Sequence, residues 1–380
     1  MYKAYITKLS KFLPNMPVCN EDMESYLGFI DDKKSRARAL ILRNNGIKSR
    51  YYALNEKGDY THTNAELAYY AIKNIEEQGF DLNDLELLAI GTSSSDQLLP
   101  SHASMIHGLL KNRPMEVITP EGSCNSGMLG LKYAYMSILT GNTENAIAGG
   151  SELASSWILS KNFKEEVETA KIDSLGEKPY IQFEREFLRW MLSDGSAVAL
   201  IQNKPTEGEL SLKIEFVDIL SFSNELPTCM YAGGELNEDG NLIPWRRYTN
   251  QDLIKKSIFG VRQDTSVLAK NIVEAGAKGI KRVTEKYNFT TEEVDYFLPH
   301  MSSEFFRNKI EEEAEKIGCP LPQTKWFTNL HKCGNVGSAS AFLMLEELFN
   351  SGQLEKGQKI LVMNPESARF SYAYVLLTVV

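Results

Sequence analysis

Residues 121–127 read Glu-Gly-Ser-Cys-Asn-Ser-Gly, and they join two apolar runs of different character. The run before them, 115–119, is short and β-favouring, whereas the run after them, 128–139, has the length of a buried helix that ends at Gly141. A cysteine in such a turn lies where backbone N–H groups and the helix dipole stabilise a thiolate. We therefore predict that Cys124 is a nucleophile, and a buried structural cysteine is the alternative interpretation.

The order of elements around this turn occurs twice along the chain. In each half the sequence predicts helix, strand, helix, strand, helix and strand, which indicates parallel sheets with helices on their faces. The elements predicted in the first half are a helix from the capping box at Thr63 to Gly79, strands at 86–91, 115–119 and 145–149, and helices at 101–110 and after Cys124. Those predicted in the second half are helices at 265–287, 303–317 and 337–351, and strands at 294–298, 325–328 and 359–364. Two further predicted strands lie at 197–201 and 371–380.

This repeat divides the chain into two α/β halves, residues 1–205 and residues 206–380. Residues from about 151 to 190 carry many charges and aromatic rings, and we predict that they form a cap insertion in the first half. Residues from about 221 to 260 are rich in glycine and proline, and we predict a loop insertion in the second half. Both insertions are expected to cover the core and to shape a pocket or a subunit interface.

Two polar residues of the second half complete a possible nucleophilic site with Cys124. His300 follows the predicted strand 294–298, and Asn335 lies in a small, polar segment before the helix 337–351. Open α/β sheets build their sites at the carboxyl ends of strands, so these residues are expected to face one cleft if the halves pack about a pseudo-twofold axis. A histidine and a side-chain amide together can stabilise a developing enolate.

Other histidines are weaker candidates. His331 is the rival of His300, but it lies in a predicted turn rather than at the end of a strand. His62, His102 and His107 have no partner pattern, and we interpret them as structural.

Composition limits the class of protein. The chain has 380 residues, 43% of them hydrophobic and 24% charged, with a formal net charge of -9 and no basic stripe, which argues against nucleic acid as the main partner. No apolar run is long enough to cross a bilayer, and residues 1–9 lack the apolar core of a signal peptide, so we expect no membrane association and a cytoplasmic location. The five cysteines are widely spaced, which favours free thiols. No zinc-binding or nucleotide-binding motif is present, and neither a metal nor an organic cofactor is expected.

With these residues, the chain resembles the condensing enzymes of the thiolase fold, especially 3-oxoacyl-acyl-carrier-protein synthase III. The resemblance extends over almost the whole chain, because several short motifs occur in the family's order and spacing. They are Asn45-Gly-Ile-Lys-Ser-Arg50, Gly91-Thr-Ser-Ser-Ser95, Leu99-Pro-Ser-His-Ala103, Gly149-Gly-Ser-Glu152, Ser193-Asp-Gly-Ser-Ala197 and Asn335-Val-Gly-Ser-Ala-Ser340.

The resemblance implies a fold and a mechanism. The fold is a five-layered αβαβα core made of the two pseudo-repeated halves. Cys124 accepts an acyl group from a coenzyme A or acyl-carrier-protein thioester, and His300 and Asn335 stabilise the enolate of a second thioester that attacks the acyl-cysteine in a Claisen condensation. The backbone N–H of Cys124 forms part of the oxyanion hole. The resemblance also implies a homodimer.

The chain departs from this family near its C-terminus. The family has a glycine-rich turn that supplies a second oxyanion amide, whereas this chain reads Asn364-Pro-Glu-Ser-Ala-Arg-Phe370, and the amide is expected near Ser367. Residues 12–28, with Ser35-Arg-Ala-Arg38 and Arg50-Tyr-Tyr52, resemble the bacterial ketosynthases that make dialkylresorcinols. Those enzymes join two β-ketoacyl thioesters and cyclise the product to a cyclohexanedione.

Four alternatives remain open from the sequence. The first is an ordinary synthase III that uses a malonyl-carrier protein in the initiation of fatty acid synthesis. The second is a hydroxymethylglutaryl-coenzyme A synthase, for which we find no additional general acid. The third is a papain-like protease, which also orders Cys, His and Asn along the chain, although Cys124 lacks that motif's aromatic neighbour. The fourth is a non-catalytic subunit of a heterodimer, which the intact Cys124 disfavours.

Overall fold

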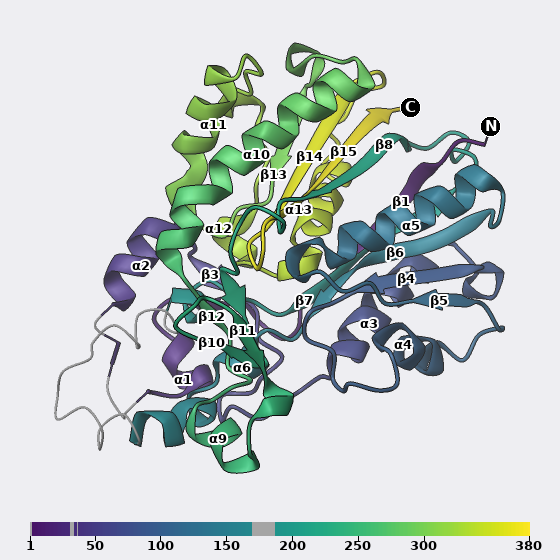
Figure 1. Cartoon of the computed structure of the whole chain (residues 1–380). Helices are drawn as coiled ribbons and strands as arrows, with labels where there is room; N and C mark the ends of the chain where they lie inside the picture. Colours follow the sequence, from purple (N-terminus) through teal and green to yellow (C-terminus); the bar gives the residue numbers. More distant parts are fainter. Residues whose placement is uncertain (1, 31–33, 36, 169–186) are drawn as a thin grey trace.

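A nine-stranded mixed sheet forms the centre of the molecule. The computed structural model describes residues 2–30, 34–35, 37–168 and 187–380. The strand order is β13-β14-β15-β8-β1-β7-β6-β4-β5 (Figure 1). Its strands are β1 (Tyr5–Phe12), β4 (Leu87–Gly91), β5 (Glu116–Ile118), β6 (Asn145–Glu152), β7 (Gly195–Gln202), β8 (Leu212–Ser221), β13 (Tyr296–Pro299), β14 (Lys359–Glu366) and β15 (Ser371–Val379).

The sheet consists of two similar parts. Strands β5-β4-β6-β7-β1 come from the first half of the chain, and β13-β14-β15-β8 come from the second. The parts meet where β1 and β8 pair antiparallel through only two residue pairs, Tyr5 with Lys213 and Ile6 with Leu212. In both parts the strands near the outer edge are parallel, as with β4 and β5 or β13 and β14, and the inner neighbours are antiparallel.

Helices cover both parts of the sheet on both faces. The main helices are α3 (Asn64–Glu77), α4 (His102–Leu110), α5 (Ser126–Thr140), α10 (Thr265–Tyr287), α11 (Arg307–Lys316) and α13 (Ser340–Phe349). Smaller helices are α1 (Met23–Leu27), α2 (Arg38–Asn45), α6 (Ser155–Ile158), α9 (Asn250–Lys255) and α12 (Leu330–Cys333). Short strands lie outside the large sheet: β2 (Val18–Cys19), β3 (Ser49–Arg50), β9 (Met230–Tyr231), β10 (Gly234–Leu236), β11 (Leu242–Pro244) and β12 (Arg262–Gln263).

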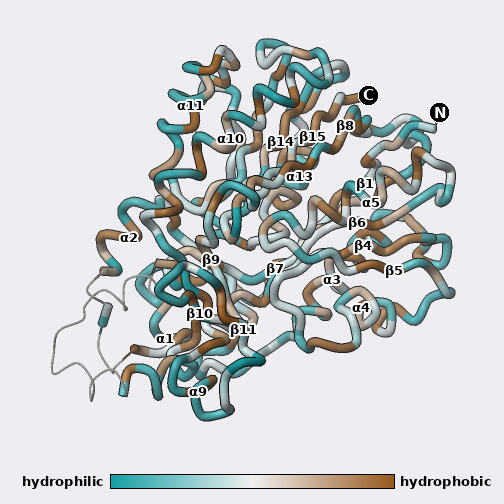
Figure 2. Tube along the Cα trace, viewed as in Figure 1, coloured by the Kyte–Doolittle hydropathy of each residue, from teal (hydrophilic) through white to brown (hydrophobic). Residues whose placement is uncertain are grey.

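Successive side chains of each strand point to opposite faces of the sheet, and this alternation explains the layers. On β15, Tyr372 and Tyr374 pack into the core beneath α10, whereas Ala373 and Val375 face the opposite way, into the core around α5 and α13. On β7, Val198 packs toward α3 and α4, while its neighbours on the strand face the same central core. The layers are therefore α3 with α4, the first part of the sheet, α5 with α13, the second part, and α10 with α11. Figure 2 shows the sheet strands as hydrophobic segments between these helices. The predicted five-layered α/β architecture is confirmed.

The two central helices lie unusually close to the strands at their N-terminal ends. A Cβ atom at Gly127 of α5 would come within 2.5 Å of the Ser338 carbonyl oxygen, and one at Gly150 of β6 would come within 2.3 Å of it. Only glycine permits this approach of backbone to backbone. The close packing brings the turn at Cys124 and the segment after Asn335 to the middle of the molecule.

One predicted strand is wrong. Residues 325–328 contribute a single parallel bridge between Trp326 and Phe297 of β13, preceded by a 3-10 turn, η7 (Gln323–Lys325). Two prolines, Pro320 and Pro322, and the bond from the Trp326 indole to the Leu321 carbonyl oxygen, 2.8 Å long, curl the chain away from the sheet edge. The segment lies where β5 lies in the first half, as a reduced counterpart of that strand.

Strands β1 and β8 were not anticipated, although they join the two parts of the sheet. Of the cap insertion expected at about 151–190, residues 169–186 lie outside the described residues, and the described part contains α6 and the 3-10 turn η3 (Ser160–Phe163). The loop insertion at about 221–260 contains the hairpin β10–β11 and helix α9. Within the described residues, no helix has the length and apolarity required to span a bilayer.

Candidate active site

A strained turn presents Cys124. The 3-10 turn η2 (Ser123–Asn125) lies between β5 and α5, and Ser123 has a φ of 46°, a left-handed conformation that costs a non-glycine residue about 1 kcal/mol or more. The residue before it, Gly122, has a φ of 152° and needs no such strain. This backbone keeps Cys124 at the N-terminal end of α5, as the sequence predicts.

The sequence predicts a stabilised thiolate at Cys124, whereas the surroundings of this residue in the structure favour the neutral thiol. Burial raises its pKa well above the ordinary value for cysteine, and the nearby carboxylates of Glu366 and Glu152 raise it further. The backbone N–H of Cys124, which faces its own sulfur, favours the thiolate but does not outweigh the burial. The thiol of Cys124 is therefore neutral at neutral pH, and an attack by its sulfur would require a base.

The second half of the chain holds this turn in place. Asn364, near the end of β14, donates from Nδ2 to the Cys124 carbonyl oxygen at 2.9 Å and to Oδ1 of Asn125 at 2.8 Å. Asn125 in turn donates to the Ser371 hydroxyl at 2.9 Å. Each hydrogen bond joins residues more than 200 positions apart in the sequence. The position of the nucleophile thus depends on the packing of the two halves.

His300 follows directly after β13. Its backbone N–H donates to the Met363 carbonyl oxygen at 2.8 Å, which fixes it beside β14. Burial lowers the pKa of its imidazole to about 4, so the ring is neutral at neutral pH. A neutral imidazole has one nitrogen that accepts a proton and one that donates a hydrogen bond.

Asn335 has a fixed side-chain orientation. Its Oδ1 accepts from the Gly337 backbone N–H at 2.9 Å and from the Ser340 hydroxyl at 3.4 Å. Because the oxygen is engaged within its own loop, the Nδ2 group is the part of the amide that is left to donate to another molecule. The helical turn η8 (Gly337–Ala339) leads from this loop into α13.

Glu152, at the end of β6, supports the Asn335 loop. Its carboxylate accepts from the Ser338 backbone N–H at 3.3 Å and from the hydroxyl groups of Ser93 at 2.8 Å and Ser94 at 2.6 Å. The carboxylate is buried, and burial raises its pKa. The sequence motif Gly149–Glu152 identified the segment, but only the structure reveals that Glu152 connects it to the Asn335 loop.

The hairpin between β14 and β15, in the stretch where the chain lacks the glycines that the resemblance implies, is organised by a carboxylate. Glu366 accepts from the backbone N–H groups of Ala368, Arg369 and Ser371, with distances of 3.3 Å from Arg369 and 3.2 Å from Ser371. The Ser371 hydroxyl donates to it as well, at 3.2 Å. Ser367 is next to this carboxylate, and its hydroxyl accepts from the Gln263 amide at 2.9 Å. Within the described part of the chain, the backbone N–H of Ser367 forms no hydrogen bond.

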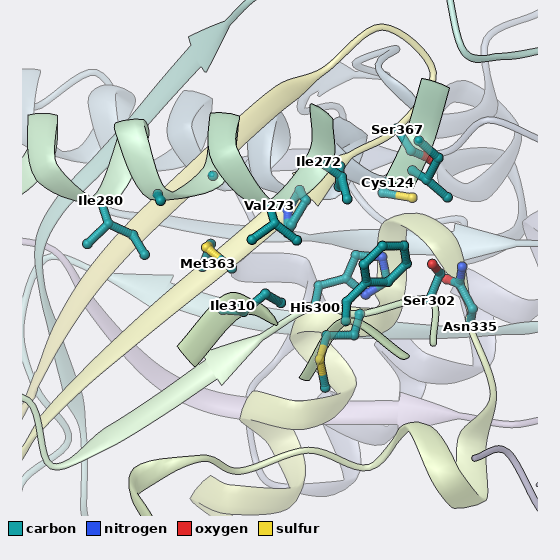
Figure 3. A pocket seen from close by; sticks show the side chains of 16 residues that line it. Cys124, Ile272, Val273, Ile280, His300, Ser302, Ile310, Asn335, Met363 and Ser367 are labelled. Carbon is teal, nitrogen blue, oxygen red and sulfur yellow. The ribbon is translucent and has the colours of Figure 1, made fainter. Parts of the chain in front are cut away.

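One pocket brings the predicted residues together. Cys124, His300, Asn335 and Ser367 all line it, and Figure 3 shows their side chains around the same end. The wall opposite them belongs to α10. Ser367, near which the sequence predicts the second oxyanion amide, therefore lies at the pocket, and the role of its amide stays a prediction.

The rival residues lie elsewhere. His331 is exposed on α12, and it does not line the pocket. His102 is buried with its ring 2.7 Å from the Ser151 hydroxyl, and His107 contacts the Arg113 carbonyl oxygen at 3.2 Å. All five cysteines are free. Among the described residues, no cluster of three or more His, Cys, Asp or Glu side chains is arranged to hold a metal ion.

Comparisons with known proteins find similarity to one class of enzymes. The family model described as 3-oxoacyl-acyl-carrier-protein synthase III C terminal matches residues 284–377, which include His300, Asn335 and Ser367. The chain is similar to the β-ketoacyl-acyl-carrier-protein synthase III of Chlorobaculum tepidum, with 22% identity over 95% of both chains. It is also similar to that of Clostridium perfringens, with 24% identity over 96% of this chain and 95% of the relative.

Solved structures show the same fold. The tetronic acid condensing enzyme AbyA1 superimposes with a TM-score of 0.76 at 17% identity, over 99% of both chains. A Xanthomonas campestris OleA with bound lauric acid and lauroyl-CoA has a TM-score of 0.76 at 16% identity, over 99% of both chains. Synthase III of Thermus thermophilus has a TM-score of 0.72 at 18% identity, over 98% of both chains. The chain therefore has the thiolase-type fold of these enzymes, and the expected class, an acyltransferase related to synthase III, agrees with the comparisons.

Proposed function

We propose that this chain is a ketosynthase that forms a carbon–carbon bond between two acyl thioesters. The observation that supports it best is the convergence of Cys124, His300 and Asn335, from both halves, on one pocket that Ser367 also lines. A nucleophilic thiol, an imidazole, an amide donor and two backbone donors are the groups that acyl transfer and enolate formation require.

The first step is the transfer of an acyl group to the enzyme. The Cys124 sulfur attacks the thioester carbonyl carbon, and the neutral His300 imidazole accepts the thiol proton. The oxyanion is stabilised by the backbone N–H groups of Cys124 and Ser367. As the intermediate collapses, the carbon–sulfur bond to the carrier breaks, and the departing thiolate takes the proton from His300.

The second step forms the carbon–carbon bond. A second thioester loses carbon dioxide from its α-carbon, or loses an α-proton to His300, and the resulting enolate oxygen accepts hydrogen bonds from His300 and from Nδ2 of Asn335. The α-carbon attacks the acyl-cysteine carbonyl. The bond to the Cys124 sulfur then breaks, which releases the β-ketoacyl product, and the thiolate takes back a proton from His300 or, after decarboxylation, from water.

The donors are acyl-carrier-protein or coenzyme A thioesters. We keep the acceptor open between two classes: a malonyl thioester, as in an ordinary synthase III, and a β-ketoacyl thioester whose condensation product cyclises to a dialkylresorcinol precursor. The similar sequences are named synthase III, which favours the malonyl acceptor, and the likeness to AbyA1 and OleA is one of fold. The division of the chain near residues 205 and 206 is part of the same proposal, and the cytoplasmic location stays a prediction.

A homodimer is also part of the proposal. Within the described part of the chain, β5 forms one edge of the large sheet and pairs only with β4. Exposed apolar side chains flank this edge: Met105 and Leu109 on α4, and Met136 on α5. Such a combination of an open strand edge and apolar flanks favours pairing with a second copy of the chain.

Intact-mass measurement tests the proposed acyl transfer. The purified protein is incubated with acyl-coenzyme A and acyl-carrier-protein thioesters, and we expect a mass gain equal to one acyl group. The gain should disappear in Cys124→Ala and persist in Cys19→Ala, whose exposed thiol lies outside the pocket. Acylation of Cys124→Ala to the same extent, or no acylation by any thioester, would overturn the proposed function.

The acceptor is then identified by adding malonyl-carrier protein or a β-ketoacyl thioester to the acylated enzyme. Release of a linear β-ketoacyl product from the first supports the ordinary synthase III. A cyclohexanedione from the second supports the dialkylresorcinol branch. Cleavage of peptides that depends on Cys124 would instead favour a protease.

A further inference from the structure

The pocket extends from Cys124 along one face of α10. The residues of α10 that line it are spaced as a single helical stripe: Leu268, Ile272, Val273, Gly276, Ala277 and Ile280. Opposite this stripe lie Met363 of β14 and Ile310 of α11. Figure 3 shows Ile272 close to Cys124 and Ile280 at the far end, with Met363 and Ile310 between them.

The two ends of the pocket differ in polarity. The polar side chains that line it, Cys124, His300, Ser302, Asn335 and Ser367, lie together at one end in Figure 3. The remainder of the lining is aliphatic or aromatic, apart from glycine and proline. A phosphopantetheine arm carries two amide groups, and burying them against such a wall without hydrogen-bond partners costs several kcal/mol. An alkyl chain has no such cost, and its burial is favourable by about 0.8 kcal/mol for each CH₂ group.

The length of the stripe limits the chain that fits. Eight helical positions separate Ile272 from Ile280, which corresponds to about 12 Å along the helix axis. An extended saturated chain advances about 1.3 Å per carbon, since each carbon–carbon bond is about 1.5 Å and the chain is a zigzag. The space beyond the thioester therefore accommodates about nine carbons before it reaches Ile280.

We propose that this channel binds the unbranched, medium-length acyl chain carried by Cys124, and that Ala277 and Ile280 set its maximum length. The inference rests on the proposed function, since it assigns the donor of the same site. Ala277, buried and small, leaves the middle of the channel open. Ile280, which is only 1% exposed, closes its far end together with Ile310.

The test compares chain-length profiles. The rate of acylation, as kcat/KM, is measured with saturated acyl-coenzyme A thioesters from butyryl to palmitoyl, for the wild type, Ala277→Phe and Ile280→Ala. We expect the wild-type rate to fall by about tenfold for each methylene beyond the preferred length, which is the usual penalty in a closed apolar pocket. Ala277→Phe should prefer shorter chains, and Ile280→Ala should prefer chains longer by about two carbons, because it removes three side-chain carbons from the end wall.

Val283→Ala is the matched control. Val283 is a buried aliphatic residue of the same helix, but it does not line the pocket, so its truncation should lower stability without changing the preferred chain length. If Ala277→Phe does not fold, the chain-length profile of Ile280→Ala alone tests the channel assignment. An unchanged profile in folded Ile280→Ala, or the same change in Val283→Ala, would refute the channel assignment.

The outcome is distinguishable from failure of the proposed function. If Cys124 is acylated but the profile does not respond to α10, the ketosynthase proposal stands and the channel proposal falls. If Cys124 is not acylated by any thioester, both fall. If a branched or aromatic acyl-coenzyme A acylates Cys124 faster than every linear thioester, the unbranched substrate class is wrong.

Discussion

The residues of the candidate site form a neutral pair rather than an ion pair. Burial raises the pKa of the Cys124 thiol and lowers that of the His300 imidazole to about 4, so both groups are uncharged near neutral pH. An unpaired thiolate in a buried site carries a large desolvation cost. The base that removes the proton must therefore be close to the thiol.

The buried histidines make stability depend on pH. The pKa of both His102 and His300 is lowered to about 4, from an ordinary value of about 6.5 in the unfolded chain. Between these values the unfolded chain binds more protons than the folded protein. The free energy of unfolding therefore has its highest value above pH 6.5 and decreases as the pH falls toward 4. Each of the two histidines should lower the free energy of unfolding by about 1 kcal/mol between pH 7 and pH 5.5.

Urea unfolding at several pH values measures this effect. In His102→Asn the decrease in unfolding free energy between pH 7 and pH 5.5 should be smaller than in the wild type by about 1 kcal/mol. The same substitution at the exposed His331, His331→Asn, provides the control for the loss of a histidine side chain. Equal slopes in the wild type and in His102→Asn would contradict the assignment of His102 as a buried neutral imidazole.

The sequence was sufficient to select three residues that line one pocket, because Cys124 and Asn335 lie in segments of small residues before a helix and His300 follows an apolar strand. It was not sufficient to identify Glu152 and Glu366. A glutamate in a sequence resembles a solvated surface residue, and only the tertiary fold buries these carboxylates among backbone N–H groups. The expectation of a stabilised thiolate failed for the same reason, since desolvation cannot be judged from local sequence.

At the scale of elements, the long helices with periodic apolar residues were predictable from the sequence, whereas the short segment at a sheet edge was not. The helices at α3, α5 and α10 follow from caps and apolar periodicity, and Thr63 forms the predicted capping box with Glu66. The segment 325–328 contains strand-favouring residues, but a four-residue edge segment depends on the sheet to which it pairs. Strands β1 and β8 were missed because neither lies within the helix–strand repeat that guided the prediction.

The β14–β15 hairpin offers an element-scale prediction. Glu366→Gln replaces an acceptor of four hydrogen bonds by an amide whose NH₂ group must face backbone donors. We expect stability to fall by about 1–3 kcal/mol. Because the hairpin positions the Ser367 N–H, we also expect kcat for condensation to fall by about 100-fold, the typical effect of losing one oxyanion donor.

A purely structural role for Glu366 would leave kcat unchanged in the folded fraction. A second measurement separates the two roles. The Glu366 carboxylate raises the pKa of Cys124, so Glu366→Gln should lower that pKa and accelerate alkylation of Cys124 by iodoacetamide at pH 8. Glu355→Gln, at an exposed position between α13 and β14, serves as the control for both measurements.

At the scale of the whole molecule, the two halves are interdependent. The nucleophile turn belongs to the first half, but Asn364 and Ser371 of the second half hold it, and Glu152 of the first half holds the Asn335 loop of the second. The pocket therefore exists only when the halves are packed together. The duplicated pattern predicted this arrangement in outline, but the reciprocal hydrogen bonds required the three-dimensional structure.

The proposed homodimer is also tested at the scale of the whole molecule. If a second copy pairs along β5, the wild-type protein should sediment in analytical ultracentrifugation as a species of twice the mass of the chain. Met105→Glu combined with Met136→Glu places two charges on the helices that flank this edge, and burying them in an interface is costly. We expect this variant to sediment mainly as a monomer, whereas Ile254→Glu, at a position that is 61% exposed on α9, should remain a dimer. A monomeric wild type would refute the dimer, and a dimer unaffected by the paired glutamates would place the interface on another surface.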